Sequence, residues 1–298
     1  MLDGKVAIVT GAGQGLGRAE ALFLASLGAR VVVNDLGVAL DGSPGPERLA
    51  DRVVEEIRAA GGEAVADHGD AADWDHARKL VELAVETFGD LHVLVNNAGF
   101  LRDTMVFNLD EDDWDSVIRV HLKGHAANSK WATKYWRDRS KETGGPVYGR
   151  IVNTSSEAIF GNPGQPNYAA AKAGIASLTV ATARAVLKYG VTANAICPRA
   201  RTRMTEGIFA PSGDDFDELS VDNVTPLVGY LASPASAGVS GQVFLVYGGM
   251  VSVLGGPHVL QRFDTEGRWS VEGLADTLGA YYEDRRPIED GYGGTLFA

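Results

Sequence analysis

The sequence has little that would suit a secreted, membrane-bound or nucleic-acid-binding protein. Its 298 residues include one cysteine, Cys197, which excludes an internal disulfide framework and is interpreted as a small core residue. No run of apolar residues reaches the roughly eighteen that a membrane span requires. The first apolar run begins at Val6, too early for a secretory signal peptide. Acids outnumber bases 39 to 27, which argues against a nucleic-acid partner. We therefore expect a cytoplasmic protein without a membrane partner.

Apolar runs and amphipathic segments alternate along the chain without a linker between them. This alternation predicts one α/β domain of the Rossmann type, a doubly wound parallel sheet of about seven strands flanked by helices. We expect the domain to occupy residues 1–249 and a C-terminal extension to occupy residues 250–298. The expected strands lie near residues 5–10, 29–34, 63–67, 91–95, 149–155, 191–197 and 242–247. The expected helices lie near residues 15–28, 47–61, 73–89, 111–141, 166–189 and 221–232.

A glycine-rich loop joins the first expected strand to the first expected helix. Thr10–Gly17 reads TGAGQGLG and directly follows the apolar run Val6–Val9. Glycines let the backbone approach a pyrophosphate, and the amides at a helix N-terminus attract its negative charge. The strand–turn–helix context gives the motif its weight. The loop predicts a dinucleotide site that includes Gly11, Gln14, Gly15, Leu16 and Gly17.

An acid follows the second expected strand. Asp35 comes directly after Arg30–Asn34, eighteen residues beyond Gly17. A carboxylate here accepts hydrogen bonds from the adenosine ribose of NAD and repels the 2′-phosphate of NADP. Gln14 also leaves the loop without a cation for that phosphate, although Arg18 lies just beyond it. We therefore expect NAD as the cofactor, with an ordinary strand-end carboxylate as the alternative for Asp35.

A hydroxyl, a phenol and an amine recur at a spacing that suits proton transfer. Tyr168 and Lys172 are four residues apart and therefore share one face of a helix. A phenol has a pKa of about 10, which a nearby ammonium lowers, so the tyrosine becomes usable as an acid or base. Ser155, thirteen residues upstream, can return beside the pair after a strand and a loop. Its neighbour Ser156 is expected to point the opposite way along the strand. The trio predicts interconversion of an alcohol and a ketone.

With these motifs in place, residues 2–249 resemble the short-chain dehydrogenase/reductase family. Three family motifs occur in order: TGxxxGxG at Thr10–Gly17, NNAG at Asn96–Gly99 and YxxxK at Tyr168–Lys172. The resemblance implies that Lys172 holds the nicotinamide ribose, Ser155 binds the substrate oxygen and Tyr168 transfers the proton. It further implies cofactor contacts from Asp70, Ala71, Asn96, Ala98, Gly99, Tyr168, Lys172, Pro198 and Thr202.

Two departures from the family pattern point to one of its branches. His121 replaces the asparagine that most members carry seven residues after Trp114, and the PGxxxT segment is altered and shortened at Pro198–Thr205. Both features resemble the dehydrogenase part of the peroxisomal multifunctional β-oxidation enzymes, which oxidise 3-hydroxyacyl-CoA thioesters with NAD, and related hydroxysteroid dehydrogenases. His121 is expected either to replace the asparagine in a proton relay or to be a buried histidine bonded within its helix.

The resemblance implies an NAD-dependent oxidoreductase for a secondary alcohol on a bulky, lipid-like small molecule. One alternative is a dehydrogenase or reductase for a small polar alcohol or sugar. A catalytically silent NAD-binding protein is a remote alternative, because such a protein normally loses the tyrosine or the lysine. The remaining histidines lack the spacing of metal ligands, so we expect them to be solvated and expect no metal.

The substrate-binding segment and the C-terminal tail carry no specific motif, so their predictions rest on position and composition. Met204–Val221 is the usual lid position. The arginines just before it, Arg199, Arg201 and Arg203, are expected either to anchor phosphates of NAD or CoA or to form ion pairs with Asp214, Asp215, Asp217 and Glu218. The tail carries an apolar stripe that suggests docking on the same or a neighbouring subunit of a homodimer or homotetramer, with Glu283–Ala298 arching over an active site. The stripe is Trp269, Leu274, Leu278, Tyr281 and Tyr282. A second group, expected in the core or at a subunit contact, is Trp131, Tyr135 and Trp136.

Overall fold

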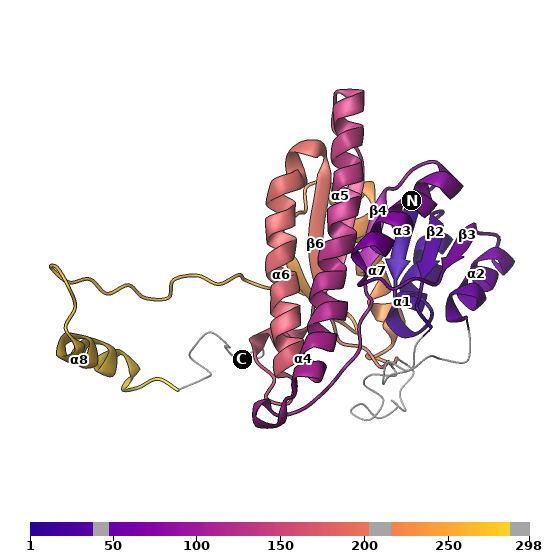
Figure 1. Ribbon diagram of the computed structural model, residues 1–298. Coiled ribbons are helices and arrows are strands. Elements are labelled where there is room, and N and C mark those ends of the chain that lie inside the picture. Colours follow the sequence, from indigo (N-terminus) through magenta and orange to yellow (C-terminus); the bar gives the residue numbers. More distant parts are fainter. Residues whose placement is uncertain (38–47, 203–215, 287–298) are drawn as a thin grey trace.

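An eight-stranded sheet forms the centre of the molecule in the computed structural model, which describes residues 1–37, 48–202 and 216–286 (Figure 1). The strands are β1 (Val6–Thr10), β2 (Arg30–Asn34), β3 (Ala64–Asp67), β4 (Val93–Asn96), β5 (Gly149–Thr154), β6 (Val191–Pro198), β7 (Val243–Tyr247) and β8 (Met250–Val253). Their order in the sheet is β3-β2-β1-β4-β5-β6-β7-β8. The pairs from β3 to β7 are parallel and β8 is antiparallel to β7. The doubly wound α/β fold predicted from the sequence is confirmed.

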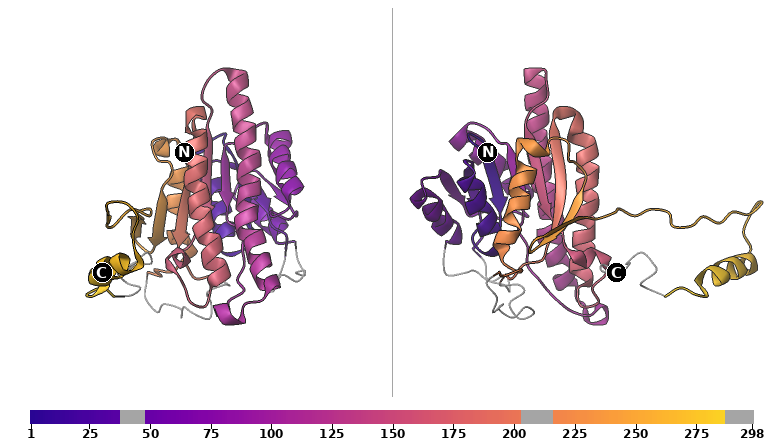
Figure 2. Two further views of the ribbon diagram at one scale, coloured as in Figure 1. Left: turned by 60° about the vertical axis from the view of Figure 1, so that its left-hand side comes forward. Right: turned by 180° about the vertical axis from the view of Figure 1, so that it is seen from behind.

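Helices cover both faces of this sheet (Figures 1 and 2). They are α1 (Gly15–Ser26), α2 (Leu49–Ala59), α3 (Trp74–Phe88), α4 (Glu111–Ile118), α5 (Gly124–Thr143), α6 (Pro166–Val186), α7 (Thr225–Ala232) and α8 (Val271–Tyr282). Side chains of α1, α2 and α7 join one buried apolar cluster, and side chains of α3, α5 and α6 join the other. The helix α8 lies apart from both layers (Figure 1).

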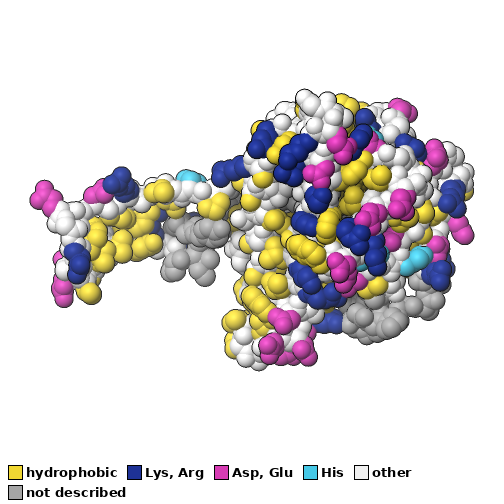
Figure 3. Space-filling model, turned by 45° about the horizontal axis from the view of Figure 1, so that its top comes forward, with side chains coloured by type: hydrophobic (Ala, Val, Ile, Leu, Met, Phe, Trp, Pro, Cys, Tyr) yellow, Lys and Arg dark blue, Asp and Glu magenta, His cyan; other side chains and the backbone are white. Residues whose placement is uncertain are grey.

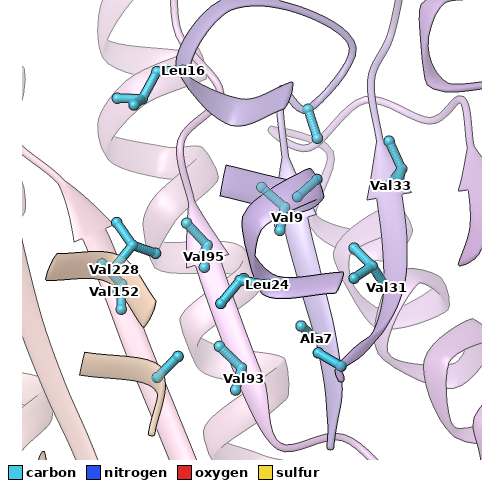
Figure 4. Close-up of a cluster of buried hydrophobic side chains, with 14 of the residues drawn as sticks. Ala7, Val9, Leu16, Leu24, Val31, Val33, Val93, Val95, Val152 and Val228 are labelled. Atoms are coloured by element: carbon cyan, nitrogen blue, oxygen red, sulfur yellow. The ribbon is translucent and has the colours of Figure 1, made fainter. Parts of the chain in front are cut away.

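The two apolar clusters take alternate residues of the same strands. In β1, Ala7 and Val9 belong to the cluster under α1, whereas Val6 and Ile8 belong to the cluster under α3. Figure 4 shows Val9 beside side chains from β2 and β4, with Leu24 of α1 above them. A strand buried on both faces must be apolar at every position, which explains the continuous run that predicted β1.

The order of the strands reverses between β1 and β4, because β1 pairs with β2 on one side and with β4 on the other. The chain therefore leaves these neighbouring strands towards opposite faces of the sheet. In open α/β sheets the crevice at such a switch point, outside the carboxyl ends of the strands, is where ligands bind. The glycine loop begins there, directly after Thr10.

Two elements differ from the sequence prediction. The helix expected over residues 111–141 is interrupted by a π-helical turn, Arg119–Lys123, between α4 and α5. The sheet also continues past the predicted boundary at residue 249, because β8 folds back on β7 and pairs Tyr247 with Met250. β8 was missed because it has four residues, of which Val251 and Val253 are exposed, so no buried run marks it.

The helix α6, with the 3-10 turn that follows it, is the single segment among the described residues that is long and apolar enough to cross a membrane. Its mean hydropathy is 1.2 over the most apolar window. Buried side chains such as Ile175 and Ala183 place it inside the domain, where Ala183 joins the cluster under α3. A third of this window is buried, along the face that carries Ile175 and Ala183.

A fully buried carboxyl group, that of Glu20, lies in α1. Glu20 is fully buried, and neither of its carboxylate oxygens has a hydrogen-bond partner among the described residues. Burial alone raises the pKa of Glu20 to about 8. The group is therefore mainly protonated at neutral pH, one turn behind the glycine loop.

Residues 254–286 form an arm that leaves the domain after β8 (Figures 1 and 2). The first part of the arm is extended and exposed, and α8 follows it with the Ser270 hydroxyl capping the amide of Gly273. No residue of α8 is buried. The predicted helical stripe is present, except that Trp269 precedes the helix.

Candidate active site

A cavity of about 810 Å³ opens at the carboxyl ends of the central strands. Most of the residues predicted for the cofactor and the chemistry line it, namely Gly11, Gln14, Gly15, Leu16, Asp35, Asp70, Ala71, Ala98, Gly99, His121, Ser155, Tyr168, Lys172, Pro198 and Thr202. These residues come from eight separate stretches of the sequence. The fold therefore gathers the glycine loop and the Ser–Tyr–Lys trio around one space.

The glycine loop is shaped for a close ligand. Gly15 has a positive φ of 54°, and a Cβ built on it would meet only Thr202 side-chain atoms, 3.8 Å away across the cavity. Gly11 instead packs against the chain, since its Cβ would lie 2.7 Å from the Cα of Ala98. Gly17 is outside the cavity lining, and its Cβ would lie 2.3 Å from the carbonyl oxygen of Gly11. One glycine thus leaves room for a ligand and two permit close backbone packing.

Asp35 is fixed at the edge of the cavity by two backbone amides. The amide of Gly13 donates to one carboxylate oxygen and the amide of Gly37 to the other, both at 2.8 Å. Arg18, the nearby cation considered for a phosphate, forms an ion pair with Glu56 and is outside the cavity lining. The two amides therefore hold the carboxylate in position at the end of β2.

Asp70 forms a second acidic position on the same side of the cavity. One of its oxygens accepts the amide of Ala72 at 2.8 Å, and the other accepts a guanidinium hydrogen of Arg119 at 2.7 Å. Arg119 also lines the cavity and was not foreseen from the sequence. Its place in the π-helical turn, rather than its sequence context, brings it opposite Asp70.

Asn96 lies behind the cavity wall. Its side chain is fully buried, and its amide nitrogen donates to Ser129 at 3.2 Å and to Asn153 at 2.9 Å. The neighbouring Asn97 does line the cavity, while its side-chain amide donates to the carbonyl of Gly11 at 3.1 Å. The NNAG motif therefore fixes the glycine loop to β4, and Asn97, Ala98 and Gly99 are the residues of the motif that line the cavity.

Tyr168 and Lys172 stand at the inner end of the cavity. The ammonium nitrogen of Lys172 lies 5.3 Å from the centre of the Tyr168 ring and donates to the carbonyl oxygen of Thr154 at 2.6 Å. Burial lowers the pKa of Lys172 to about 7 and raises the pKa of Tyr168 to about 12. In this arrangement burial outweighs any lowering of the tyrosine pKa by the ammonium, so the predicted lowering is not present.

Both serines at the end of β5 line the cavity. The Ser155 hydroxyl is buried and donates to the carbonyl of Lys172 at 2.9 Å. The Ser156 hydroxyl accepts the amide of Ala158, and its hydrogen bonding with Tyr168 opposes the rise of the tyrosine pKa. The expectation that Ser156 points away is wrong, because β5 ends at Thr154 and strand alternation no longer applies beyond it.

His121 contacts the backbone of another segment instead of its own helix. Its Nε2 lies 2.7 Å from the carbonyl oxygen of Phe100, and its ring meets the Tyr168 ring edge-on with centres 5.2 Å apart. Its Nδ1 is buried without a hydrogen-bond partner in the described part of the chain. Gly99 leaves space for this ring, because a Cβ there would lie 2.1 Å from Cε1 of His121.

His125 is a second buried histidine in the same region, so the expectation that the histidines other than His121 are solvated is wrong for this residue. It is 2% exposed, and its Nε2 has no partner within the described ranges. Burial, together with the charge of Lys172, lowers the pKa of His125 to about 3 and the pKa of His121 well below its usual value. Both rings are therefore neutral. The sequence signal that could have identified His125 is its spacing, one helical turn after His121.

The arginines near the lid form ion pairs. Arg199 pairs with Glu157 at 2.7 Å and lines the cavity, and Arg201 pairs with Asp217 at 2.6 Å. Of the predicted acids, Asp217 is thus confirmed as a partner, and Glu157 was not anticipated. The predictions for Arg203, Asp214, Asp215 and the lid residues 204–215 lie outside the described residues.

The remaining predictions concern the core. Cys197 is buried and unpaired, as expected. Trp136 is 1% exposed and donates from its indole nitrogen to the carbonyl of Leu91, so it belongs to the core. Trp131 and Tyr135 are partly buried at the edge of the same cluster, bonded to Trp74 and Asp90.

The model of the short chain dehydrogenase family matches residues 5–212, and the chain belongs to this family. It is 51% identical over 297 residues to the hydroxyacyl-CoA dehydrogenase ChsB1 of Mycobacterium tuberculosis, covering 96% of this chain and 91% of that protein. A crystal structure of a short chain dehydrogenase from Mycobacterium avium has 52% identity and a TM-score of 0.87, covering 98% of this chain and 99% of the other.

Longer proteins are also similar to this chain. The peroxisomal multifunctional enzyme type 2 of Drosophila melanogaster is 46% identical over 230 residues, which cover 77% of this chain but 36% of that enzyme. The chain therefore spans about a third of that protein. These relatives confirm the predicted family and its resemblance to the multifunctional enzymes, and they establish the chain as an oxidoreductase acting on small molecules.

Proposed function

We propose that the protein is an NAD-dependent dehydrogenase that interconverts a 3-hydroxyacyl-CoA and the corresponding 3-oxoacyl-CoA. The observation that carries this proposal is the single cavity shared by Ser155, Tyr168, Lys172 and the acid Asp35. The similarity to ChsB1, a hydroxyacyl-CoA dehydrogenase, supports the acyl-CoA substrate. The shared cavity supports a dehydrogenase more strongly than a silent binding protein, because both proton-transfer residues line it.

The residues at the switch point fit a dinucleotide. Gly15 leaves open space where a pyrophosphate would lie, and the first amides of α1 begin at the same place. Asp35 would accept the adenosine ribose hydroxyls, and its negative charge would oppose a 2′-phosphate. The basic residues that line the cavity, Arg102, Arg119, Lys172 and Arg199, are outside the glycine loop. This placement favours NAD.

The inner end of the cavity supplies the acid/base chemistry. The bound nicotinamide would supply the hydride acceptor. During oxidation Tyr168 accepts the hydroxyl proton of the alcohol, while the hydride leaves the same carbon. Ser155 donates a hydrogen bond to the substrate oxygen, after turning from the carbonyl of Lys172. Lys172, whose side-chain nitrogen lies 5.3 Å from the centre of the Tyr168 ring, would bind the ribose of the nicotinamide and so orient it beside the tyrosine.

Apolar side chains border the cavity where a substrate enters. Phe100 and Leu101 line it, and Met105, Val106 and Phe107 are exposed a few residues further along the chain. This surface favours a substrate with an apolar acyl or steroid part over a small polar alcohol. Arg102 and Arg199 line the same cavity and suit the phosphates of CoA.

A substrate panel tests this function. The panel would contain long- and short-chain 3-hydroxyacyl-CoAs, hydroxysteroids and sugar alcohols. Each substrate would be incubated with NAD and, separately, with NADP, and the absorbance of the reduced cofactor would measure its formation. We expect NADH from the acyl-CoA thioesters and none from the Tyr168→Phe variant. Turnover of sugar alcohols in preference to every thioester would refute the substrate class, and equal rates in the variant would refute the mechanism.

We also infer that the protein acts in the cytoplasm, without a membrane or nucleic-acid partner. The net charge of −12 and the single buried thiol support this assignment. The test is cell fractionation with an antibody against the chain. Recovery in the membrane or extracellular fraction would contradict it.

A further inference from the structure

One wall of the cavity belongs to the segment that follows β4, and this segment is bonded to the start of α6. We define the substrate wall as the three lining residues that follow the NNAG motif, Phe100, Leu101 and Arg102. Just beyond the wall, the amide of Thr104 donates to the carbonyl of Gly164 at 2.8 Å. The side-chain nitrogen of Gln165 donates to the carboxylate of Asp103, also at 2.8 Å. The segment is therefore attached to the chain that leads into Tyr168.

A buried asparagine joins the wall directly to the catalytic tyrosine. Asn167 is fully buried and is not among the described residues that line the cavity. Its side-chain nitrogen donates to the carbonyl oxygens of Arg102 and Asp113, each at 3.1 Å. Its side-chain oxygen accepts the amide of Tyr168 at 2.8 Å, in the first turn of α6, where backbone donors have no partner within the helix. One side chain thus connects the wall, α4 and Tyr168.

The other end of the wall also contacts the tyrosine. Nε2 of His121 lies 2.7 Å from the carbonyl oxygen of Phe100, and the His121 ring meets the Tyr168 ring edge-on. Tyr168 is therefore connected to the first residue of the wall through His121 and to the last through Asn167. Because protein interiors are close-packed, a displacement of the wall must move the phenol or break these contacts.

The outer side of this region is exposed to solvent. Three large apolar side chains follow Thr104 and are 41%, 67% and 76% exposed, those of Met105, Val106 and Phe107. In Figure 3 hydrophobic and acidic side chains lie together at the lower end of the domain, and the first turn of α4 carries three acids. Burial of these side chains against the described chain therefore does not hold the segment. Its hydrogen bonds to α6 do.

We propose that Asn167 is a positioning residue that transmits binding of an acyl chain at the substrate wall to Tyr168, and thereby gives the enzyme a preference for long substrates. Binding energy from a part of the substrate remote from the reacting carbon can orient catalytic groups, so that a truncated substrate loses kcat as well as affinity. The wall is the remote site, and Tyr168 is the group that is oriented. This role rests on the proposed function, because an acyl chain is what the wall would contact.

Kinetics with long- and short-chain 3-hydroxyacyl-CoAs test this role. In the unmodified enzyme we expect kcat to be about tenfold higher for the long thioester. Asn167→Ser should lower it to the value for the short thioester, while kcat for the short thioester and KM for NAD change by less than about twofold. A tenfold difference that survives in Asn167→Ser, an equal fall for both thioesters, or no difference in the unmodified enzyme would overturn the role.

The matched control is Asn194→Ser. Asn194 is also fully buried, and its side chain also bonds to two backbone groups, the carbonyl of Val239 at 2.9 Å and the amide of Gln242 at 3.1 Å. It lies on β6 and is not among the described residues that line the cavity. The control should lose stability and keep the difference between the two thioesters. If Asn167→Ser does not fold, Asn167→Asp replaces it, since the carboxylate has the same shape and no hydrogen to donate to the wall.

Hydrogen exchange of the full-length protein supplies a test that needs no substrate. The amide of Thr104, next to the wall, should exchange more than about tenfold faster in Asn167→Ser and at an unchanged rate in Asn194→Ser. An unchanged rate in Asn167→Ser would overturn the connection between Asn167 and the wall. Turnover of no thioester by the unmodified enzyme would refute the proposed function, whereas the exchange rates would still decide whether Asn167 holds the wall.

Discussion

The polar groups at the two ends of the cavity differ in whether they have hydrogen-bond partners among the described residues. At the adenosine end, both oxygens of Asp35 accept backbone amides, and Asp70 is paired with Arg119. At the catalytic end, buried polar atoms of His121, His125 and Thr154 have no partner among the described residues. The first end therefore holds fixed charges for a ligand, whereas the second favours neutral groups whose protons can move.

The largest expected effect comes from removing the phenol at the neutral end. Tyr168→Phe should lower kcat for alcohol oxidation by about 10³-fold, because general acid/base catalysis is lost while the ring packing remains. In the unmodified enzyme the rate should rise with pH, since burial raises the pKa of Tyr168 to about 12 and the phenolate is the form that accepts a proton. Steady-state kinetics from pH 6 to about 10 measure both effects. A flat pH profile would contradict the role of Tyr168.

Glu20, in the helix α1 that follows the glycine loop, is a further buried group that is mainly uncharged at neutral pH. Burial raises the pKa of Glu20 from its ordinary value of 4.5 to about 8, so the folded state retains a proton that the unfolded state loses. Stability from this group is therefore present below about pH 4.5 and decreases as the pH rises towards 8.

Glu20→Gln should raise the unfolding free energy at pH 7 by about 3 kcal/mol, because the amide has no proton to lose. Thermal unfolding at several pH values measures this difference. The gain should shrink at pH 5, where both forms are neutral in the folded state. An equal effect at both pH values would show that the gain has another origin.

A smaller effect should separate the two serines. Ser155→Ala should lower kcat by about 10²-fold through loss of a hydrogen bond to the substrate oxygen. Ser156→Ala should lower it by less than about tenfold, because Ser156 mainly caps the turn that follows. Parallel kinetics of both variants with one substrate decide the assignment. The reverse order would transfer the substrate contact to Ser156.

The smallest effect is expected at the charged end. Asp35→Ala should narrow the preference for NAD over NADP by about tenfold, with kcat for NAD little changed, because the carboxylate acts on the adenosine ribose and not on the reacting atoms. The ratio of kcat/KM for the two cofactors measures it. Glu56→Ala, which releases Arg18 without altering Asp35, is the matched control. An unchanged ratio in Asp35→Ala would remove this residue from cofactor choice.

The positions of residues beside the glycine loop could be predicted from the sequence better than those of residues around Tyr168. The glycine loop directly follows β1 and Asp35 directly follows β2. A sequence motif is therefore enough to predict where they lie. Arg119 could not be placed in this way, because it lies in a π-helical turn, which changes which side chains face the cavity. The two serines illustrate the same limit, since the end of β5 decides where Ser156 points.

The hairpin between β7 and β8 also bears on how such a chain can be lengthened in evolution. Gly248 and Gly249 reverse the chain at the edge of the sheet, so that the segment after β8 leaves the domain without crossing the strands that carry the catalytic groups. New sequence added there leaves from β8, which β6 and β7 separate from β5, the strand that precedes Ser155. The same exit therefore suits either an arm or a fused domain, and gene fusion at this point would leave the older chemistry intact.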